Sequence, residues 1–387
     1  MSLIYVIAGE ASGDVLGARL IAALRARQPD LTFAGIGGPA MAAQGVYSLF
    51  PMRELALMGL FEVLPKLFAL RRRLRETIAD ITQRKPAVVV TIDSPGFTLR
   101  VLRGVRRLGV KRVHYVAPQA WAWRERRVKK FPGLWDELLC LLPFEPAFFA
   151  RHKLTARFVG HPVLESGIET GNAARFRAAN GLAPNGLAAD RPLLIIMPGS
   201  RAAEIERHLP IMAEAFHLLL KQIPGLVPVI PVSERDSNRL AAATAYWTAR
   251  PILVRGDTAK HDAFAAATAA LSKSGTSTLE LALAGVPMVV TYRMHGLTAA
   301  IARRVIKVRY ASIINLLADR AVLPEFIQRD CTAEKLVAGL LPLLTDPAAA
   351  QAQRDATRPL LETLRAPGGA KPSEAAADAI LALLEQT

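Results

Sequence analysis

"LIYVIAGEASGD", residues 3–14, is the stretch that decides the fold. Six apolar or aromatic residues lead into a turn that contains Gly9 and Gly13, and a helical pattern follows over residues 14–27. A short unbroken apolar run that ends in such a turn predicts a buried strand of a parallel sheet, followed by a helix. Because the run is short and no basic residue precedes it, we expect a first strand here rather than a signal peptide.

The same strand-to-helix unit recurs along the chain, which predicts an α/β fold. In the first half we expect strands at residues 3–8, 31–38, 87–93, 110–117 and 137–142, and a further helix at 97–108. After a polar stretch rich in Gly, Ala and Asn at 166–190, a second series of strands is predicted at residues 192–201, 226–232, 269–275 and 286–293.

Length and pattern together predict two Rossmann-like domains, since 387 residues are too many for one ordinary core. We place an N-terminal domain at residues 1–165, a C-terminal domain at 166–365 and a helix returning to the first domain at 366–387. Residues 374–386 support that helix, because their apolar side chains recur at helical spacing. Ligands bind at the carboxyl ends of parallel strands, so we expect the chemistry in the loops after strands, facing an interdomain cleft.

Composition and charge narrow the class of partner. Hydrophobic residues make up 51% and charged residues 21%, which is typical of a globular protein. The net charge is +16, and residues 1–165 hold 25 Lys and Arg against 13 Asp and Glu. The first half therefore faces an anionic partner, and nucleic acid, anionic lipid and a phosphorylated substrate all remain open.

Cysteine and carboxylate spacing give no sign of a metal or disulfide site. Cys140 and Cys331 are far apart, which fits a reducing cytosol rather than a disulfide framework or a zinc site. The chain has no D-x-D sequence, so we expect no metal and no cofactor. It also has no stretch of about 18 uninterrupted apolar residues, and we expect no membrane span.

Two candidate sites follow strands of the first half. In "VVVTIDSPGF", residues 88–97, Asp93 at a strand end can accept a proton from a hydroxyl nucleophile; an Asx-type turn or a helix cap is the alternative. In "AGEASGD", residues 8–14, the spacing is not that of a dinucleotide fingerprint. Its carboxylates, Glu10 and Asp14, either hold sugar hydroxyls or, for Asp14, complement a helix N-terminus.

Two loops of the second half predict a diphosphate site. In "IIMPGSR", residues 195–201, Gly199 lets the backbone approach a ligand, Ser200 can donate and Arg201 can bind a phosphate with both nitrogens of its fork. "SKSGTSTLE", residues 272–280, is a second turn of small residues with free N–H groups, although Ser277 and Glu280 also fit a capping box.

Two further stretches combine apolar and basic residues. Residues 54–75 predict an amphipathic helix that Pro65 kinks, either a core helix with a solvated end or an interfacial helix on anionic lipid. Its apolar and basic positions are Leu57, Leu60, Phe61, Leu64, Leu67, Phe68, Arg71, Arg72, Arg73 and Arg75. "VAPQAWAWRERRVKK", residues 116–130, sets Trp121 and Trp123 before a basic helix; no nucleic-acid-binding motif accompanies it, which favours the wall of a site or a solvated helix.

Taken together, these motifs resemble the lipid-A-disaccharide synthases, glycosyltransferases with the two-domain B-type fold. The matching runs, which lie in order from residue 7 to about 328, are "IAGEASGDVLGARL", "GIGGPAM", "LALMGLFEVLPKL", "TIDSPGF", "HYVAPQAWAWRERRVKK", "LLPFE", "FVGHPVLE", "MPGSR", "SGTSTLELALAGVPMVVTYR" and "NLLADRAVLPEFIQ". The sequence departs from the family pattern at Gly96, Ala117 and Lys273.

The resemblance implies an inverting transfer of diacylglucosamine from its UDP derivative to the 6-hydroxyl of diacylglucosamine 1-phosphate, with UDP released. It implies Asp93 as general base and donor-side residues at Arg201, Gly275, Thr276, Glu280 and Asn315. To this donor site we add Gly199, Ser200 and Ser274 of the same loops. We expect the acceptor or cleft residues to be Glu10, Ser12, Gln119, Trp121 and His161, and the membrane or acyl-chain contacts to be Leu57, Leu60, Phe61, Leu64, Phe68, Arg71 and Arg72.

The partners that the resemblance implies are acylated UDP-glucosamine, acylated glucosamine 1-phosphate and the inner face of the inner membrane of a Gram-negative bacterium, with no nucleic acid; a homodimer stays open. Two rival hypotheses remain at this point. One is another UDP-sugar transferase or an epimerase of the same fold with a soluble substrate. The other is a non-catalytic basic protein that binds through residues 71–75 and 124–130.

Overall fold

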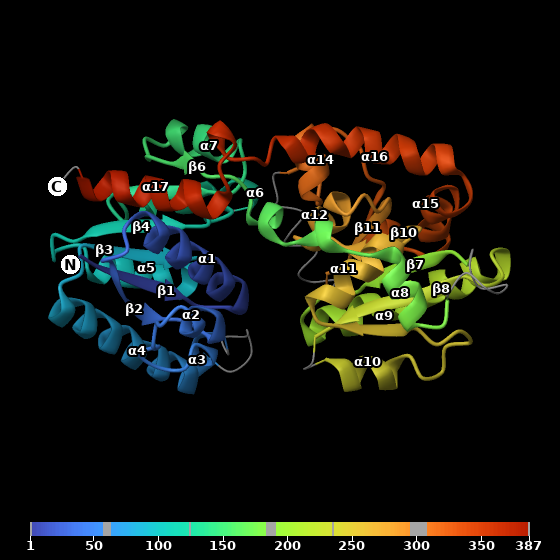
Figure 1. The fold of residues 1–387 in the computed structure, drawn as a ribbon, viewed down its shortest axis with the longest axis horizontal. Helices are drawn as coiled ribbons and strands as arrows, with labels where there is room; N and C mark the ends of the chain where they lie inside the picture. The colour runs from blue at the N-terminus through green and yellow to red at the C-terminus, as the bar shows by residue number, and fades with distance from the viewer. Residues whose placement is uncertain are drawn as a thin grey trace. The chain divides into compact units, whose positions relative to one another are not determined.

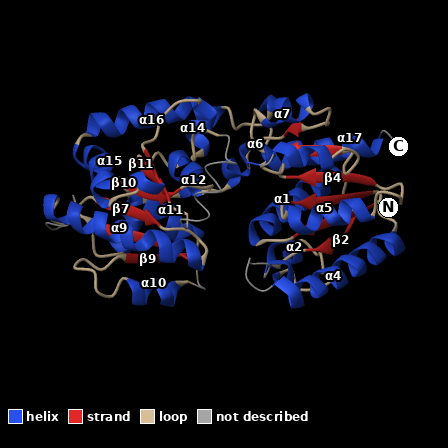
Figure 2. Ribbon diagram, turned by 180° about the vertical axis from the view of Figure 1, so that it is seen from behind, coloured by secondary structure: helices blue, strands red, loops and turns tan. Residues whose placement is uncertain are grey.

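The computed structural model describes residues 2–56, 63–123, 125–182, 191–233, 236–294 and 308–385. The chain forms two compact units, the first made of residues 1–165 with 364–387 and the second of residues 166–363. Each unit has a six-stranded sheet with helices on both faces (Figures 1 and 2). The prediction of two α/β units with parallel sheets is therefore confirmed.

The first sheet has the strand order β2-β1-β3-β4-β5-β6, and all its neighbours are parallel. Its strands are β1 Leu3–Ala8, β2 Thr32–Ile36, β3 Val88–Ile92, β4 Lys111–Tyr115, β5 Glu137–Cys140 and β6 Arg157–Phe158. Alternate residues of β1 face opposite layers of the core: Tyr5 and Ile7 pack in one cluster, and Ile4 and Val6 in another. A strand buried on both faces needs the unbroken apolar run that the sequence shows.

The helices of the first unit cover both faces of this sheet (Figure 2). They are α1 Ala11–Arg27, α2 Pro39–Ala43, α3 Arg53–Ala56, α4 Val63–Arg84, α5 Pro95–Gly104, α6 Ala120–Trp123, α7 Glu145–Arg151 and α17 Pro372–Glu385, with 3-10 helices η1 Glu125–Lys130, η2 Pro162–Glu165 and η5 Pro367–Gly369. Pro65 lies two residues after Val63, the first described residue of α4.

The terminal helix α17 completes the first unit. Ala376 and Ile380 are fully buried in the cluster that holds Leu20 and Ile21 of α1. The Glu165 carboxylate accepts hydrogen bonds from the N–H and the hydroxyl of Ser373, at 3.0 and 2.5 Å. The prediction that the last helix returns to the first domain is thus confirmed.

The second sheet has the order β12-β11-β10-β7-β8-β9 and is also parallel. Its strands are β7 Leu193–Met197, β8 Val227–Val232, β9 Ile252–Arg255, β10 Ala269–Lys273, β11 Met288–Tyr292 and β12 Glu325–Ile327. Its helices are η3 Ile168–Thr170, α8 Ala173–Ala179, α9 Ala202–Gln222, α10 Ser237–Ala243, α11 Asp257–Ala266, α12 Ser277–Leu283, α14 Ile313–Ala318, η4 Gln328–Asp330, α15 Ala333–Thr345 and α16 Pro347–Glu362.

All nine predicted strands are present. β1 has the predicted length, and the other eight are shorter than their predicted runs. The three strands that the sequence reading missed, β6, β9 and β12, all lie at sheet edges. They are two to four residues long, and most of their residues are only partly buried. Edge strands of this length carry too few apolar residues to show a pattern.

Candidate functional site

The loops after β1 and β3 meet at the carboxyl edge of the first sheet. β1 lies between β2 and β3, so the connection after β1 leads to one side of this strand and the rest of the sheet is built on the other side. Ligands bind at such switch points of the strand order. A Cβ built on Gly9 would lie 2.6 Å from the Cβ of Ser94, closer than two such atoms can approach. Glycine at position 9 therefore lets the loop that carries Glu10 touch the loop that carries Asp93.

Asp93 and Ser94 form a strained turn directly after β3. Both have left-handed backbone conformations, with φ of 48° and 46°. Two hydrogen bonds hold the turn: the Asp93 N–H donates to the Tyr115 carbonyl at 2.9 Å, and the Thr98 hydroxyl donates to the Asp93 carbonyl at 2.6 Å. Strain of about 1–3 kcal/mol for each such residue persists mainly at functional sites. The Asp93 side chain is half-buried, and Ser94, not Asp93, occupies the N-cap of α5.

Glu10 and Asp14 have different environments although they are four residues apart. Asp14 is buried, and its carboxylate accepts hydrogen bonds from the N–H groups of Gly38, Ala40 and Met41 at 2.7–3.0 Å. It therefore complements a helix N-terminus, that of α2, and has no place for a sugar. Glu10 is half-buried at the N-cap of α1, and Ser12, in the first turn of that helix, is exposed.

Residues 116–130 fold into the single turn α6 and the 3-10 helix η1. Gln119 is exposed, as are four cations of η1, whereas Val128 is buried beneath them; the cations are Arg126, Arg127, Lys129 and Lys130. Arg124 and the side chain of Trp123 lie outside the described residues. The basic segment is thus a solvated 3-10 helix that one apolar residue anchors.

Trp121 points into the first unit. Its indole N–H donates to Glu145 Oε1 at 3.0 Å, and its ring packs edge-on against Phe144. Glu145 is buried, and its other oxygen accepts from the N–H groups of Leu141 and Leu142 at 3.1 and 3.0 Å. Burial raises the pKa of Glu145 to about 7, although these three donors favour the charged form. The indole N–H of Trp121 is therefore engaged within the protein.

His161 is also an internal residue. It is buried, its Nδ1 accepts a hydrogen bond from the Val163 N–H at 3.1 Å, and burial lowers its pKa to about 4. A neutral imidazole with this bond carries its proton on Nε2. His161 therefore fixes the start of η2.

In the second unit, the switch point lies between β7 and β10. Gly199 follows β7 with φ of 125°, and a Cβ there would lie 2.6 Å from the Cβ of Glu204, so glycine is required. Glu204 Oε2 accepts from the Ser200 N–H at 3.1 Å, while Oε1 lies 3.1 Å from Lys273 Nζ and 3.8 Å from Arg201. Glu204 therefore joins the loops after β7 and β10.

The charge balance of this cluster follows from burial and pairing. Burial raises the pKa of Glu204, but the attraction of Lys273, its hydrogen bond and the Ser200 N–H outweigh burial, so the pKa is lowered. His208 of α9 links this helix to the end of β11. Its Nδ1 bonds to the Glu204 carbonyl, and its Nε2 accepts a hydrogen bond from the N–H of Arg293, the residue after β11. Burial lowers the pKa of His208, which favours this neutral form.

The loop 274–280 presents backbone groups and one carboxylate. The Ser274 hydroxyl donates to the Ala311 carbonyl at 2.7 Å, and Gly275 and Thr276 follow it before α12. No side-chain hydrogen bond caps α12, so the capping box expected from Ser277 and Glu280 does not form. The Glu280 carboxylate lies 3.3 Å from Lys260 Nζ instead, with part of its surface open to solvent.

Asn315 has a structural role that sequence reasoning missed. It is fully buried, and its amide donates to the Leu323 carbonyl and to Glu325 Oε1, while its oxygen accepts from the N–H groups of Val322 and Leu323. These bonds use all four hydrogen-bonding positions of an asparagine side chain. The side chain therefore holds the loop before β12 and has no position left for a ligand.

The membrane-contact candidates fall partly outside the described residues. Leu57, Leu60 and Phe61 are not described, nor are the side chains of Leu64 and Leu67. Phe68 is 66% exposed on α4, and Arg71 and Arg72 are exposed one turn later. Arg73 differs, because it forms a two-pronged ion pair with Glu54 at 2.8 Å and lies over the Phe50 ring.

No described helix has the length and apolarity needed to cross a bilayer. Within the same residues, no group of three or more His, Cys, Asp or Glu side chains is placed to hold a metal ion.

The sequence matches the model of the family described as lipid-A-disaccharide synthetase over residues 4–379, which include both switch-point loops. The chain belongs to the lipid-A-disaccharide synthase family. It is 52% identical over 394 residues to the lipid-A-disaccharide synthase of Granulibacter bethesdensis (strain ATCC BAA-1260 / CGDNIH1), with 99% of each covered. It is accordingly a glycosyltransferase of lipid A biosynthesis, which removes the non-catalytic hypothesis.

Solved structures show the same fold at low sequence identity. The fold is similar to that in the S. aureus MnaA–UDP co-structure, with a TM-score of 0.68, 14% identity and coverage of 100% of this chain and 98% of that one. It is also similar to CalG4, the calicheamicin glycosyltransferase, with a TM-score of 0.58, 14% identity and coverage of 100% and 99%. The expected B-type fold of the lipid-A-disaccharide synthase family is thus confirmed.

The buried Glu145 carboxylate gives a pH-dependent stability that can be measured. Because its pKa is about 7 in the folded state against an ordinary value of 4.5, the folded state binds this proton more tightly. Its contribution is complete below pH 4.5 and is lost as the pH rises to 7, by about 3 kcal/mol at most.

We expect Glu145→Gln to remove this loss. The measurement is the free energy of unfolding in urea at several pH values between 4.5 and 8. The difference between wild type and variant cancels the contributions of the buried histidines, which titrate in the opposite direction. A difference that does not change with pH would contradict a raised pKa at Glu145.

Proposed function

We propose that the enzyme transfers diacylglucosamine from UDP-2,3-diacylglucosamine to the 6-hydroxyl of 2,3-diacylglucosamine 1-phosphate, with inversion. The products are the β-1,6-linked lipid A disaccharide 1-phosphate and UDP. The observation that carries the proposal is the strained Asp93 turn at the switch point of the first sheet, in a chain of this family.

Asp93 acts as general base in this reaction. Its carboxylate takes the proton of the acceptor 6-hydroxyl as the oxygen attacks the anomeric carbon of the donor, and the bond from that carbon to the UDP oxygen breaks. Half-burial favours this role, because the carboxylate then keeps an open side for the acceptor while its backbone is held by Tyr115 and Thr98. Glu10, Ser12 and Gln119 are the acceptor-side contacts that we propose around it.

Trp121 and His161 act behind the acceptor surface rather than on it. The Trp121 indole N–H bonds to Glu145, and His161 is buried beside η2. We assign both to positioning the loops after β4 and β6, since a side chain fixed by internal bonds keeps its neighbours in place.

The second unit binds UDP and stabilises it as it departs. The N–H groups near Gly199, Gly275 and Thr276 lie at the starts of α9 and α12, where helix N-termini favour phosphate; Ser200, whose N–H bonds to Glu204, contributes its hydroxyl. Arg201, with 72% of its side chain exposed, supplies a positive charge beside them. Glu280 accepts hydrogen bonds from ribose hydroxyls, and Ser274 and Asn315 hold the loops. We expect this arrangement to work without a metal ion.

The lipid substrates place the enzyme on the inner face of the inner membrane as a peripheral protein. Both substrates carry acyl chains, which water does not hold as monomers. Phe68, Arg71 and Arg72 on α4 combine an exposed ring with cations, the chemistry that an anionic lipid surface attracts. Leu57, Leu60, Phe61 and Leu64 belong to this contact by sequence.

Asp93→Asn tests the reaction and the base together. Asparagine tolerates the left-handed backbone of this turn, so we expect the fold to persist. Incubation of wild type with the two lipids should give the disaccharide by mass analysis, with or without a chelator. The variant should lose about 10²–10⁴-fold in kcat and keep its KM for the donor.

The control is Asp30→Asn, at an exposed position between α1 and β2. Full turnover in Asp93→Asn would overturn the role of Asp93. Equal turnover of wild type with acylated and deacylated UDP-glucosamine would instead favour the soluble-substrate alternative.

Glu280→Gln tests the donor site. A neutral amide accepts hydrogen bonds from ribose hydroxyls more weakly, so we expect the KM for the UDP donor to rise about tenfold with little change in kcat. Glu206→Gln is the matched control, since Glu206 is 71% exposed on α9. An unchanged donor KM in Glu280→Gln would contradict the ribose contact.

Phe68→Ala tests the membrane contact. Removing one inserted ring should weaken binding to vesicles about tenfold or more, as expected for an aromatic side chain transferred from water. Arg71→Gln with Arg72→Gln should weaken binding only to vesicles that contain an anionic lipid, and less so at high salt. Tyr246→Ala, an exposed aromatic of the second unit, is the control. Unchanged vesicle binding in both variants would contradict a contact through α4.

A further inference from the structure

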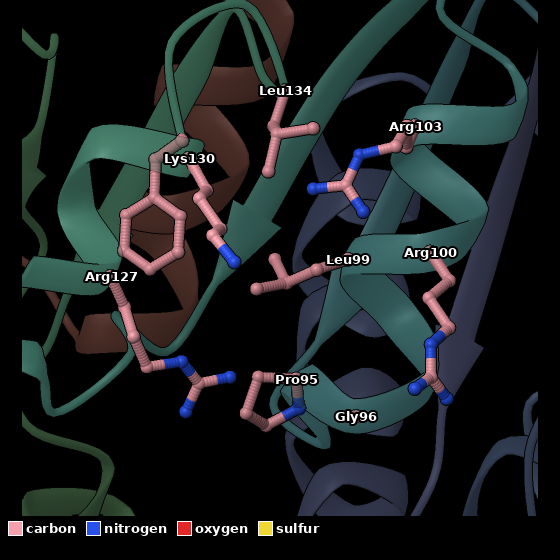
Figure 3. Close-up of a pocket in the computed structure, with 9 residues that line it drawn as sticks. Pro95, Gly96, Leu99, Arg100, Arg103, Arg127, Lys130 and Leu134 are labelled. Atoms are coloured by element: carbon pink, nitrogen blue, oxygen red, sulfur yellow. The ribbon is translucent and has the colours of Figure 1, made fainter. Parts of the chain in front are cut away.

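A cavity of about 290 Å³ opens beside the Asp93 turn, between α5 and the segment that begins with η1. The residues that line it are Pro95, Gly96, Leu99, Arg100, Arg103, Arg127, Lys130, Phe131 and Leu134. All of them belong to the first unit. Figure 3 shows the side chains of Arg103, Arg127 and Lys130 extending from the two sides into the space between them, while Arg100 lies along α5.

The lining has two chemical characters. Leu99, Phe131 and Leu134 are nearly fully buried, with 6%, 4% and 3% of their surface exposed, and form an apolar floor. Arg100, Arg103, Arg127 and Lys130 are exposed around that floor. Such a pocket suits a ligand with a small anionic group on a less polar body.

The four cations lack acidic partners within the part of the chain that the structure describes. No described carboxylate lies within ion-pair distance of any of them, in contrast to Arg84 and Arg112, which each pair with one carboxylate, and Arg73, which pairs with two. Gly96 at the mouth has no side chain, and a Cβ built there would meet nothing within 4 Å. Like charges held together without a counter-ion favour an anionic ligand.

The backbone that carries these cations is anchored. Phe97, Leu99 and Leu102 fix α5 in the core, and Val128 and Phe131 fix η1 and the residue after it in the same cluster. The backbone that carries the guanidinium and ammonium groups is therefore fixed, which lowers the entropy lost when a ligand binds. Arginine forks match the oxygens of a phosphate in particular.

The pocket begins two residues after the general base. Pro95 is within about 7 Å of Asp93 along the chain, whatever the local path. The acceptor carries its reacting 6-hydroxyl and its 1-phosphate on the same sugar ring, so its phosphate must lie about one ring away from Asp93. We propose that Arg103, Arg127 and Lys130 bind the phosphate monoester of the acceptor lipid, an assignment that rests on the proposed function.

The test compares an acceptor that carries the 1-phosphate with the same lipid without it, both in detergent micelles. We expect Arg103→Gln, Arg127→Gln and Lys130→Gln each to raise the KM for the phosphorylated acceptor about tenfold, with kcat and donor KM unchanged, since each removes one charge-assisted contact. The KM for the unphosphorylated acceptor should be the same in wild type and variants. Arg103→Lys should restore part of the loss.

Arg107→Gln is the matched control, because Arg107 is exposed just beyond α5 and does not line the cavity. Binding of glucosamine 1-phosphate, followed by ³¹P NMR, provides a readout without turnover. Weaker binding in the three variants would support the pocket even if the lipid transfer itself failed.

Three results would overturn the proposal. The first is an unchanged acceptor KM in all three variants. The second is an equal rise for phosphorylated and unphosphorylated acceptor, which would assign the pocket to the sugar or acyl chain. The third is an unchanged KM in micelles together with weaker binding to anionic vesicles, which would assign the cations to membrane headgroups.

Discussion

The approach of Gly9 to Ser94 is the contact on which the first unit's site depends. It joins the loops after the two strands where the sheet changes direction, and there is no room for a side chain at position 9. The neighbour of Ser94 is Asp93, and both hold left-handed backbone conformations that neither would choose alone. The sheet, the buried Thr98 and the Tyr115 carbonyl stabilise that turn, so the stability of the fold maintains the strain at Asp93.

In the second unit, an ion pair joins the two loops at the switch point of the sheet. Its switch point is also closed by a glycine, Gly199, but an ion pair between Glu204 and Lys273 joins the two loops. This ion pair explains how the large cation of Lys273 is accommodated in a turn of small residues. The Glu204 carboxylate partly neutralises the charge of Lys273, whereas the side chain of Arg201 stays largely exposed.

Sequence reasoning located the loops better than it assigned their side chains. Asp93 and Gly199 could be placed because a strand followed by a turn is a local pattern, and parallel sheets put such turns at one edge. Asn315, Trp121 and His161 were expected at ligands, yet their polar atoms bond to residues such as Glu325 and Glu145. Those partners come close only when the chain folds, so these hydrogen bonds could not be predicted from the local sequence.

The cations of the first unit also differ in ways that only the fold reveals, because some are paired with carboxylates and others are not. Sequence alone counts every arginine equally, but the fold pairs Arg73 with Glu54, Arg84 with Asp80 and Arg112 with Asp136. These pairs reduce the net field without offering a ligand a free cation. The cations around the cavity beside Asp93 have no such pairing among the described residues, and they come from two segments about thirty positions apart. The cations of this cavity therefore lie close to the Asp93 turn, where we propose that the phosphorylated acceptor is held and its proton is taken.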